Sequence, residues 1–412
     1  MALTPIVEEL LAYSRKYDAF IASGKQFPSS REEDEDYVNT RQAIIDGSQR
    51  LRMAAMTVDQ RLHQPPANCC QAYDVAVMRA LSELNLAQHV PDEGITFADL
   101  SRTVGIHERA LAKIMRTAIC QGLYHEPEPG LVKHTEVSKL FTLPGIQSLC
   151  RFTIATVLPS MEKLVEASKG WKGDQDPSQS AFDLAHNINK EGSATNFPDE
   201  ACFKAIMSPQ DAKGLASYPL WQEIDKPGAV FVDVGGNHGY GSLAIAKATK
   251  HVRFVVQDLP SIIERAQSQE SQPGGILVDA DAGHRIQLEP YDMFSGPQPV
   301  EQADVYFFRA VFHNWSDAKC NEILQNLMPA LKTGARIIIC DMVLPDRCEV
   351  TDEQHYSRIS DLVMFALHNA CERSANEWKA LFTSVDPRFC IKEMYPLWPG
   401  SYMKFIHVVL DS

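Results

Sequence analysis

The sequence predicts an α/β protein with a Rossmann-like, doubly wound sheet and a smaller, mainly helical N-terminal domain. Three observations support this fold class. Beyond Gly214, strand-like apolar runs alternate with helical stretches, a glycine-rich turn at residues 235–239 follows the first run, and Asp258 ends the second. A strand, a tight glycine turn and a helix N-terminus, in this order, form the first unit of a nucleotide-binding βαβ fold.

The N-terminal part has the pattern of a winged helix-turn-helix. Thr96, with Asp99 three positions later, predicts the capped start of a helix. Residues 108–118 predict a second helix, and residues 123–132 predict a hairpin. DNA binding by such a module is not expected here, because its surroundings are acidic and no basic wing follows.

Chain length and patterning predict the division into domains. A chain of 412 residues is too long for one ordinary core. Residues 144–169 should be mostly helical and join two domains, with a break at Pro159. We expect a helical extension at residues 1–66, the winged-helix-like domain with its linker helix at residues 67–170, and a cofactor-binding domain at residues 171–412.

The cofactor-binding domain should contain one sheet with helices between its strands. Its strands are expected at residues 229–234, 252–257, 276–279, 303–309 and 335–341, with a terminal antiparallel pair at residues 389–395 and 403–410.

Composition excludes several classes of partner. The formal net charge of −14 argues against nucleic acid and anionic membranes. No apolar run is long enough to span a bilayer, and the N-terminus lacks the features of a secretory signal. The ten cysteines show no metal-ligand spacing, and we interpret them as reduced thiols of a cytoplasmic protein.

The glycine turn favours one kind of cofactor. It reads Gly-Gly-Asn-His-Gly, without the spacing of the dinucleotide fingerprint, and no phosphate-binding Gly-Lys-Ser/Thr occurs. Asp233, which we place inside the turn, would repel a phosphate but suit an ammonium group. Asp258 is positioned to accept hydrogen bonds from two ribose hydroxyls. These features favour S-adenosylmethionine, a sulfonium-bearing nucleoside.

Six sequence blocks extend this interpretation. They occur at residues 232–239 (Val-Asp-Val-Gly-Gly-Asn-His-Gly), 257–260 (Gln-Asp-Leu-Pro), 291–294 (Tyr-Asp-Met-Phe), 308–317 (Phe-Arg-Ala-Val-Phe-His-Asn-Trp-Ser-Asp), 337–345 (Ile-Ile-Ile-Cys-Asp-Met-Val-Leu-Pro) and 371–374 (Cys-Glu-Arg-Ser). In these blocks and their order, the chain from about Ala67 onward resembles the caffeate-type small-molecule O-methyltransferases of plants and their fungal secondary-metabolite relatives.

The resemblance implies a set of cofactor contacts. Gly235 should meet the methionine moiety, Asp258 the ribose, and Asp292 and Met293 the adenine. Arg309 stands where the family has a lysine, which changes the donor geometry near the methionine end. The implied cofactor-binding set is Asp233, Gly235, Gly236, Asp258, Leu259, Asp292, Met293 and Arg309.

His313 is the expected general base. It follows a strand whose C-terminal end belongs to the ligand-binding edge of an α/β sheet, and a histidine near its ordinary pKa suits this role at neutral pH. The resemblance implies that Asp341 and Glu372 orient the imidazole and stabilise its protonated form. The alternatives are a structural histidine, a strand-end cap at Asp341 and a surface Glu372 paired with Arg373. Asn314 replaces the family's usual aspartate.

The resemblance also implies a substrate pocket and a partner. The small domain dimerises in the family and closes over the partner's pocket, so we expect a homodimer through the N-terminal domain. No metal is expected, because the carboxylate cluster of the magnesium-dependent catechol type is absent from the sequence. Candidate pocket residues are His134, Phe152, Met161, Phe182, Met207, Met364, Phe365 and His368.

Two enzymatic functions are therefore open. The first is an S-adenosylmethionine-dependent O-methyltransferase acting on a hydroxyl of an aromatic or polyketide-type secondary metabolite. The alternative is a non-methylating pericyclase or dehydratase of pyridone alkaloid biosynthesis, in which the sulfonium acts only as a fixed positive charge. The departures at Asn314 and Arg309 leave this alternative open, whereas the net charge of −14 disfavours a DNA-binding regulator.

Overall fold

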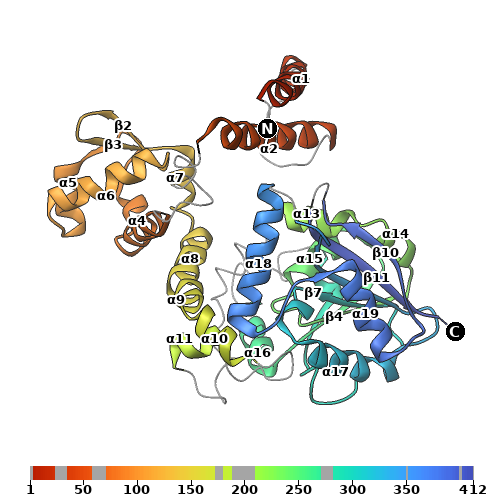
Figure 1. Cartoon of the computed structure of the whole chain (residues 1–412). Coiled ribbons are helices and arrows are strands. Elements are labelled where there is room, and N and C mark those ends of the chain that lie inside the picture. Colours follow the sequence, from red (N-terminus) through yellow and green to blue (C-terminus); the bar gives the residue numbers. More distant parts are fainter. Residues whose placement is uncertain are drawn as a thin grey trace. The chain divides into compact units, whose positions relative to one another are not determined.

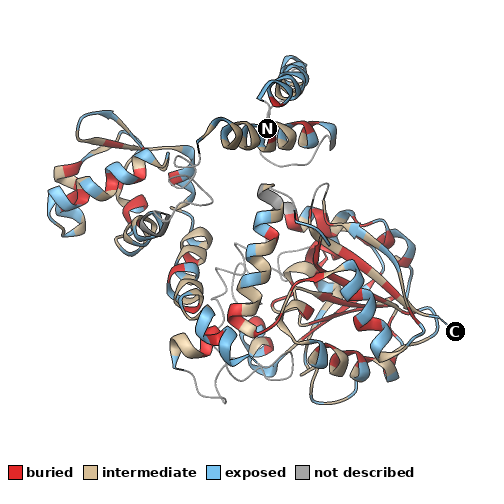
Figure 2. Cartoon of the chain, in the orientation of Figure 1, coloured by how far each residue is buried: buried red, intermediate tan, exposed pale blue. Residues whose placement is uncertain are grey.

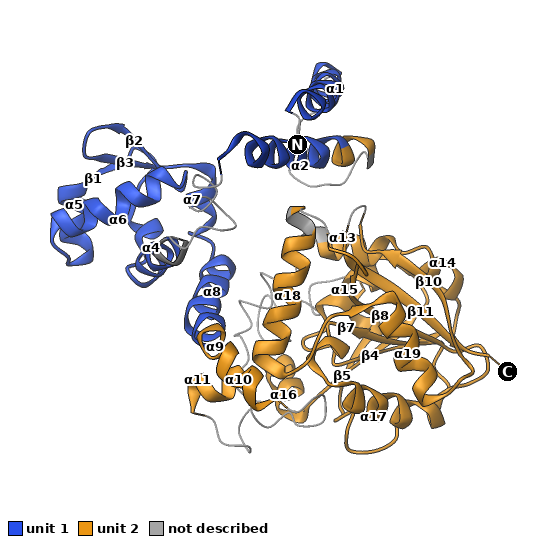
Figure 3. Ribbon diagram, in the orientation of Figure 1, with its two compact units in different colours: residues 1–24, 40–159, 194–206 blue, residues 25–39, 160–193, 207–412 orange. Residues whose placement is uncertain are grey.

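The chain forms two compact units (Figures 1 and 3). The computed structural model describes residues 3–23, 35–57, 71–171, 180–187, 209–270, 282–348, 351–398 and 401–411. Unit 1 comprises Met1–Gly24, Thr40–Pro159 and Ala194–Ile206, and unit 2 comprises Lys25–Asn39, Ser160–Ser193 and Met207–Ser412. The finer division at residues 66 and 170 stays a prediction.

Unit 1 is mainly helical, with a small sheet. Its helices are α1 (Leu3–Ala22), α2 (Glu35–Ala55, which begins in unit 2), α4 (Gln71–Glu83), η1 (Leu86–His89), α5 (Phe97–Val104), α6 (Glu108–Cys120), α7 (Glu136–Leu140) and α8 (Pro144–Phe152). The strands β1 (Ile95–Thr96), β2 (Tyr124–Glu128) and β3 (Leu131–His134) pair in the order β1-β3-β2. The Thr96 side chain accepts a hydrogen bond from the Asp99 amide at 3.1 Å, so the predicted helix cap and the predicted hairpin are both present.

The segment before residue 171 is helical and interrupted, as predicted. Helix α8 passes into a π-helical turn, η2 (Thr153–Val157), followed by α9 (Leu158–Glu162) and α10 (Leu164–Gly170). The interruption lies directly before Pro159, which has no amide hydrogen to donate to the carbonyl four residues earlier.

Unit 2 is built on one sheet. Its strands are β4 (Val230–Val234), β5 (Arg253–Asp258), β6 (Ile286–Pro290), β7 (Val305–Arg309), β8 (Arg336–Leu344), β9 (Arg373–Ser374), β10 (Phe389–Pro396) and β11 (Met403–Leu410). The order is β10-β11-β8-β7-β4-β5-β6, with β9 pairing with β8. Strands β4 to β8 pair in parallel, whereas β11 is antiparallel to both β8 and β10. This is the predicted doubly wound sheet with its terminal antiparallel pair.

Helices cover both faces of this sheet, and its central strands β4, β5, β7 and β8 are largely buried (Figure 2). Neighbouring strand residues point to opposite cores, so Phe231 packs with Trp221 while Val232 packs in the cluster that contains Trp378. The helices of unit 2 are α11 (Ala181–His186), α13 (Pro209–Ser217), α14 (Leu220–Ile224), α15 (Tyr240–Ala248), α16 (Pro260–Glu270), η4 (Gly283–Arg285), η5 (Phe312–Asn314), α17 (Asp317–Leu327), η6 (Met328–Ala330), α18 (Asp352–His368) and α19 (Ala375–Val385).

The strand predictions differ from the structure at β6 and β8. The strand expected at residues 276–279 lies outside the described residues, and β6 was not predicted. Strand β8 continues to Leu344, beyond the predicted end at residue 341, because β9 and β11 supply hydrogen-bonding partners there. Among the described residues, no helix is long and apolar enough to cross a membrane.

Candidate functional site

The glycine turn after β4 contains two glycines at which a side chain would clash with neighbouring atoms. Gly235 has a φ of +74°, a left-handed conformation that favours glycine. A Cβ on Gly235 would lie 2.9 Å from Val311 Cγ2, and one on Gly236 would lie 2.7 Å from Asp233 Cγ. The amides of both glycines donate to the Gln257 carbonyl, at 2.8 and 3.0 Å. The turn is therefore tied closely to the end of β5.

Asp258, at the end of β5, is held by the backbone. Its Oδ2 accepts from the Asn237 amide at 2.9 Å, and its Oδ1 accepts from the Leu259 amide at 2.8 Å. Burial raises the pKa of Asp258, and these amides oppose that rise. Each carboxylate oxygen can accept a further hydrogen bond, so the side chain is oriented and retains capacity for a ligand.

The position of Asp233 corrects the prediction that placed it inside the turn. It lies within β4, is 3% exposed, and accepts a hydrogen bond from Ser242 Oγ of α15 at 2.6 Å. Burial raises the pKa of Asp233 to about 6, while the Ser242 bond and the charge of Arg309 oppose the rise. Asp233 thus joins the strand to the helix beneath the turn, a contact that the sequence pattern did not reveal.

The segment after β6 lies beside Asp258. The Tyr291 amide donates to the Asp258 carbonyl at 2.9 Å, which brings the two strand ends together. Asp292 Oδ1 accepts from the Phe294 amide at 2.9 Å, and both Asp292 and Met293 are half-buried. Leu259 is 41% exposed next to Asp258. Carboxylate acceptors and apolar side chains therefore gather at the carboxyl-terminal edge of the parallel strands, an arrangement suited to a nucleoside.

A second group of side chains surrounds His313. The short helix η5 follows β7 and carries His313, whose Nδ1 lies 3.0 Å from Glu372 Oε1. Ser360 Oγ donates to the same oxygen at 3.0 Å, and the Glu372 amide donates to Asp361 Oδ1 at 3.0 Å. The Glu372 side chain is 1% exposed, so it is not a surface charge. The His313 side chain remains 17% exposed, which leaves part of the ring accessible.

Asp341 completes this group electrostatically. It lies inside β8 rather than at its end, and it is fully buried, which excludes the strand-end cap. Burial raises the pKa of Asp341 to about 6, against the opposing charge of His313. Burial alone would lower the pKa of His313, but the charges of Asp341 and Glu372 and the hydrogen bond to Glu372 raise it to about 9. The expectation of a near-ordinary pKa for His313 is therefore wrong, and the ring can act as a base only in its neutral form, whose fraction grows as the pH rises.

Other pocket candidates in unit 2 lie on or against α18. Met364, Phe365 and His368 belong to α18 and are half-buried. Phe365 packs edge-on against Trp171, with ring centroids 5.2 Å apart. Burial, with a smaller contribution from the charge of His313, lowers the pKa of His368 to about 3, so this ring is neutral.

The structure gives different surroundings for two further pocket candidates of unit 2 and does not describe the third. Met161 packs against the cluster of Ala167, Ala181 and Ala366, whereas Phe182 is buried beside His186. Met207 lies outside the described residues.

Among the residues that the structure covers, no group of His, Cys, Asp or Glu is arranged to hold a metal ion.

Two pocket candidates, His134 and Phe152, belong to unit 1. Both ring nitrogens of His134 already have partners, Ser138 Oγ at 2.8 Å and the Ala87 carbonyl at 3.2 Å. Phe152 ends α8 and is half-buried. Neither side chain has a described contact that directs it to a substrate.

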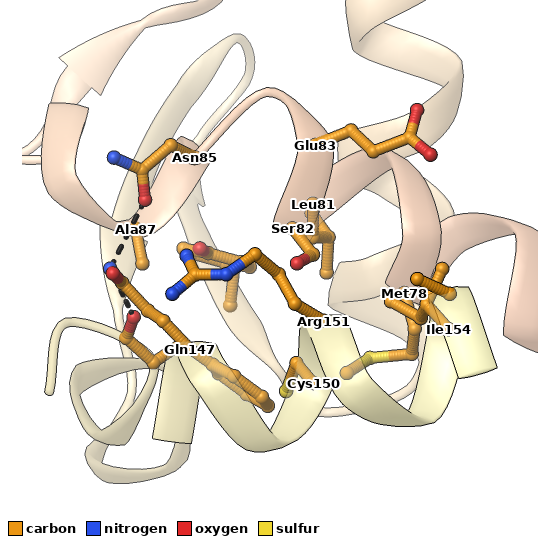
Figure 4. Close-up of a pocket in the computed structure, with 13 residues that line it drawn as sticks. Met78, Leu81, Ser82, Glu83, Asn85, Ala87, Gln147, Cys150, Arg151 and Ile154 are labelled. Atoms are coloured by element: carbon orange, nitrogen blue, oxygen red, sulfur yellow. Dashed lines mark hydrogen bonds between the residues drawn. The ribbon is translucent and has the colours of Figure 1, made fainter. Parts of the chain in front are cut away.

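Unit 1 also contains a cavity of about 450 Å³ between α4 and α8 (Figure 4). Arg151 extends across it from α8, and Gln147 bonds to the Asn85 side chain at 3.1 Å. Its lining contains neither the glycine turn nor the His313 group. The candidate site is therefore the edge of the unit 2 sheet at which the parallel strands have their carboxyl ends.

The family model and the curated relatives both indicate O-methyltransferases. An O-methyltransferase domain matches residues 210–386. A dual O-methyltransferase/FAD-dependent monooxygenase of Cercospora beticola is 35% identical over 327 residues, which are 74% of this chain and 36% of that protein, so the chain spans about a third of that relative. The chlorophenol O-methyltransferase of Trichoderma longibrachiatum is 31% identical over 94% of this chain and 86% of its own length.

Solved structures show the same fold. The crystal structure of OxaC is similar with a TM-score of 0.76 at 22% identity, covering 99% of both chains. The structure of LepI in complex with SAM has a TM-score of 0.73 at 21% identity, covering 98% of this chain and all of that one.

Proposed function

Because the chain belongs to the fungal O-methyltransferase family, we propose that it methylates a hydroxyl group of an aromatic or polyketide-type metabolite, with His313 accepting the hydroxyl proton. The observation that carries the proposal is the 3.0 Å contact between His313 Nδ1 and the buried Glu372, beside the sheet edge that bears the glycine turn. S-adenosylmethionine, the cofactor of this family, supplies an electrophilic methyl group when bound.

The proposed cofactor-binding residues fit such a molecule. Asp258 would accept from the ribose hydroxyls, because both its oxygens are fixed by backbone amides and can each accept another bond. Leu259 and Met293 would flank the adenine, and Asp292 would bind its amine. Gly235 and Gly236 would let the backbone approach the methionine part, with Asp233 and Arg309 beneath the turn.

The hydrogen-bond pattern supports one direction of proton transfer. Glu372 Oε1 accepts from Ser360 Oγ, and an ionised carboxylate accepts only, so His313 Nδ1 carries a hydrogen and donates it. In the neutral ring, Nε2 is then the nitrogen that can take the substrate's proton. Asp341 and Glu372 stabilise the resulting imidazolium, since both carboxylates raise the pKa of His313. The substrate oxygen, relieved of its proton, becomes the nucleophile.

The substrate class follows from the relatives and the half-buried side chains of α18. The name of the Trichoderma relative indicates a phenol. Met161, Met364, Phe365 and His368 of unit 2 are proposed to line the pocket, whereas His134, Phe152 and Met207 stay predictions from the resemblance. Thioether and aromatic groups suit a flat aromatic substrate.

We also propose a homodimer through the N-terminal domain and a location in the cytoplasm. The seven described cysteines are all free thiols, which supports a reducing compartment. Sedimentation velocity showing only monomers would contradict the dimer, and a fluorescent fusion found outside the cytoplasm would contradict the location.

The first experiment incubates the purified protein with S-adenosylmethionine and a panel of chlorophenols, hydroxypyridones and polyketide alcohols, followed by mass spectrometry. We expect products heavier by one methyl group, with stoichiometric S-adenosylhomocysteine. His313→Ala should lower the rate by about 10²- to 10⁴-fold, as expected for loss of a general base.

The control is His251→Ala, which removes an exposed imidazole from the same unit and leaves the hydrogen bond of the His251 amide to Asp225 in place. This variant should methylate like the wild type. Unconsumed cofactor together with an isomerised or dehydrated product would refute the proposal and favour the pericyclase alternative.

A further inference from the structure

Arg373 is a buried cation next to Glu372 that the proposed proton transfer does not use. It is 1% exposed and begins β9. β9 pairs in parallel with β8 through Val343 and Arg373, two residues beyond Asp341 on β8. Strand pairing therefore sets Glu372 and Arg373 in a fixed register relative to Asp341.

The guanidinium of Arg373 binds both ends of the turn that carries His313. Its Nη1 donates to the Phe312 carbonyl at 3.1 Å, and its Nη2 donates to the Trp315 carbonyl at 2.9 Å. These carbonyls immediately precede and closely follow the His313–Asn314 pair. The backbone of η5 is thus held from both sides by one planar group.

A second set of contacts fixes the guanidinium itself. Nε and Nη2 donate to Asp317 Oδ1 at 2.9 and 2.7 Å, at the first residue of α17. The Arg373 Cζ atom also lies 5.4 Å from the centroid of the Trp378 ring. A rigid fork can serve several acceptors in one plane, whereas the ammonium of a lysine is a single point.

Two consecutive residues therefore act on one histidine from two directions. Glu372 bonds to the ring of His313, and Arg373 bonds to the backbone on either side of it. If η5 shifted, Nδ1 would move away from Glu372 although both side chains were still present.

We propose that Arg373 is a positioning residue that fixes η5, so that His313 keeps its contact with Glu372. The inference rests on the proposed function, because it assigns Arg373 to the same proton transfer. A displacement of about 1 Å in such a group can lower the rate by about a hundredfold.

The test measures the His313 ring directly, by NMR titration of [¹³C]histidine-labelled protein, with the resonance assigned from His313→Gln. In the wild type the ring should titrate at about 9. In Arg373→Lys, which keeps the positive charge that itself opposes the raised pKa of His313, the midpoint should fall because the contact with Glu372 loosens. In Arg373→Met the loss of that charge opposes the fall, so this variant is assessed by its turnover. Binding of S-adenosylmethionine should stay within about threefold of the wild type, while turnover of a chlorophenol falls by about a hundredfold.

Arg285→Met is the matched control. Arg285 is also a guanidinium in unit 2 that donates to backbone carbonyls, those of Val252 at 2.9 Å and Thr249 at 2.8 Å, and it lies 5.9 Å from the Phe254 ring centroid. This variant should lose stability without changing the His313 titration or the turnover per folded molecule.

The outcomes separate the inference from the proposed function. An Arg373→Lys protein that keeps the wild-type His313 midpoint would refute positioning. An Arg373→Met protein that loses stability like Arg285→Met but keeps the wild-type turnover per folded molecule would refute it as well. If the wild type methylates no probe, the proposed function fails while the titration still decides the role of Arg373.

Discussion

Two neighbouring halves of the candidate site are held together by different kinds of interaction. In the half proposed to bind the cofactor, here called the cofactor half, the backbone at the ends of β4 and β5 makes the contacts. The amides of Asn237 and Leu259 donate to Asp258, and those of Gly235 and Gly236 donate to Gln257. This half should be sensitive to any added Cβ atom.

In the half proposed to carry out proton transfer, here called the catalytic half, side chains and their charges make the contacts. Glu372 accepts from His313 and Ser360, while Arg373 donates to Asp317 and to the carbonyls around His313. This half should be sensitive to loss of charge, and each half should tolerate changes that disrupt the other. Variants that change one half test whether the two halves are independent, provided that cofactor affinity and the His313 titration are both measured.

Gly235→Ala should have the largest effect. The new Cβ would require a left-handed conformation, which costs about 1–2 kcal/mol in an L-residue, and would lie 2.9 Å from Val311 Cγ2. We expect affinity for S-adenosylmethionine to fall by about a hundredfold, equivalent to about 2.7 kcal/mol, as measured by calorimetry. The His313 titration should stay unchanged.

Gly228→Ala is the control that separates the cost of a left-handed backbone from the cost of a clash between the new Cβ and its neighbours. Gly228 also has a positive φ, +86°, but an added Cβ would have no atom within 4 Å. This variant should lose comparable stability and keep normal cofactor affinity. Equal affinities in the two alanine variants would mean that the turn at Gly235 is not part of the cofactor site.

Glu372→Gln should have the next largest effect, this time on the catalytic half. It removes one of the two carboxylates that raise the pKa of His313, so the ring should titrate well below about 9. Glutamine can still accept a hydrogen bond from Nδ1, so we expect turnover to fall by about thirtyfold, less than for loss of the base itself. Cofactor affinity should not change.

The same variant, Glu372→Gln, also predicts how the stability difference from the wild type changes with pH. The folded-state pKa of His313 is raised, so the stability it contributes is fully present below the unfolded value of about 6.5 and is lost as pH rises through about 9. The wild type should therefore exceed Glu372→Gln in stability by more at pH 7 than at pH 10. A difference that is the same at both pH values in thermal unfolding would mean that Glu372 does not interact with a charged His313.

Asp258→Asn should have a smaller effect and return to the cofactor half. An asparagine keeps the size of the side chain but directs an NH₂ group at the amide of either Asn237 or Leu259, which both donate. Loss of one such bond costs about 1–3 kcal/mol, and we expect about tenfold weaker cofactor binding by calorimetry. A shift in the His313 titration would show that the two halves are coupled, contrary to the comparison.

The two halves also differ in how well the sequence predicted them. Glycines and a strand-end acid are local signals, since positive φ and close approach restrict the residue type at one position. The fold class and the strand ends at Asp258 and Arg309 were therefore predictable, and the structure confirms them. Asp233 was placed wrongly in the turn because its partner Ser242 lies on the following helix, and a composition pattern contains no such pairing.

The catalytic half depends on contacts between distant parts of the chain. His313 and Glu372 are 59 positions apart, and Arg373 and Asp317 are 56 apart. Only the resemblance of the motif blocks suggested the first pair, and nothing suggested the second. The extension of β8 past Asp341 was missed for the same reason, because it depends on pairing with β9 and β11.

Asn314→Asp should have the smallest effect, and it restores the residue usual in the family. Asn314 Nδ2 donates to the Ala310 carbonyl at 3.0 Å, and Ala310 has a left-handed φ of 53°. An aspartate would place an acceptor against this carbonyl, so we expect a loss of about 1 kcal/mol in thermal unfolding and a change in turnover below about fivefold. In an Ala310→Gly background the loss should shrink, because glycine adopts this conformation without the amide's support. An equal loss in both backgrounds would mean that Asn314 stabilises the turn independently of the conformation at Ala310.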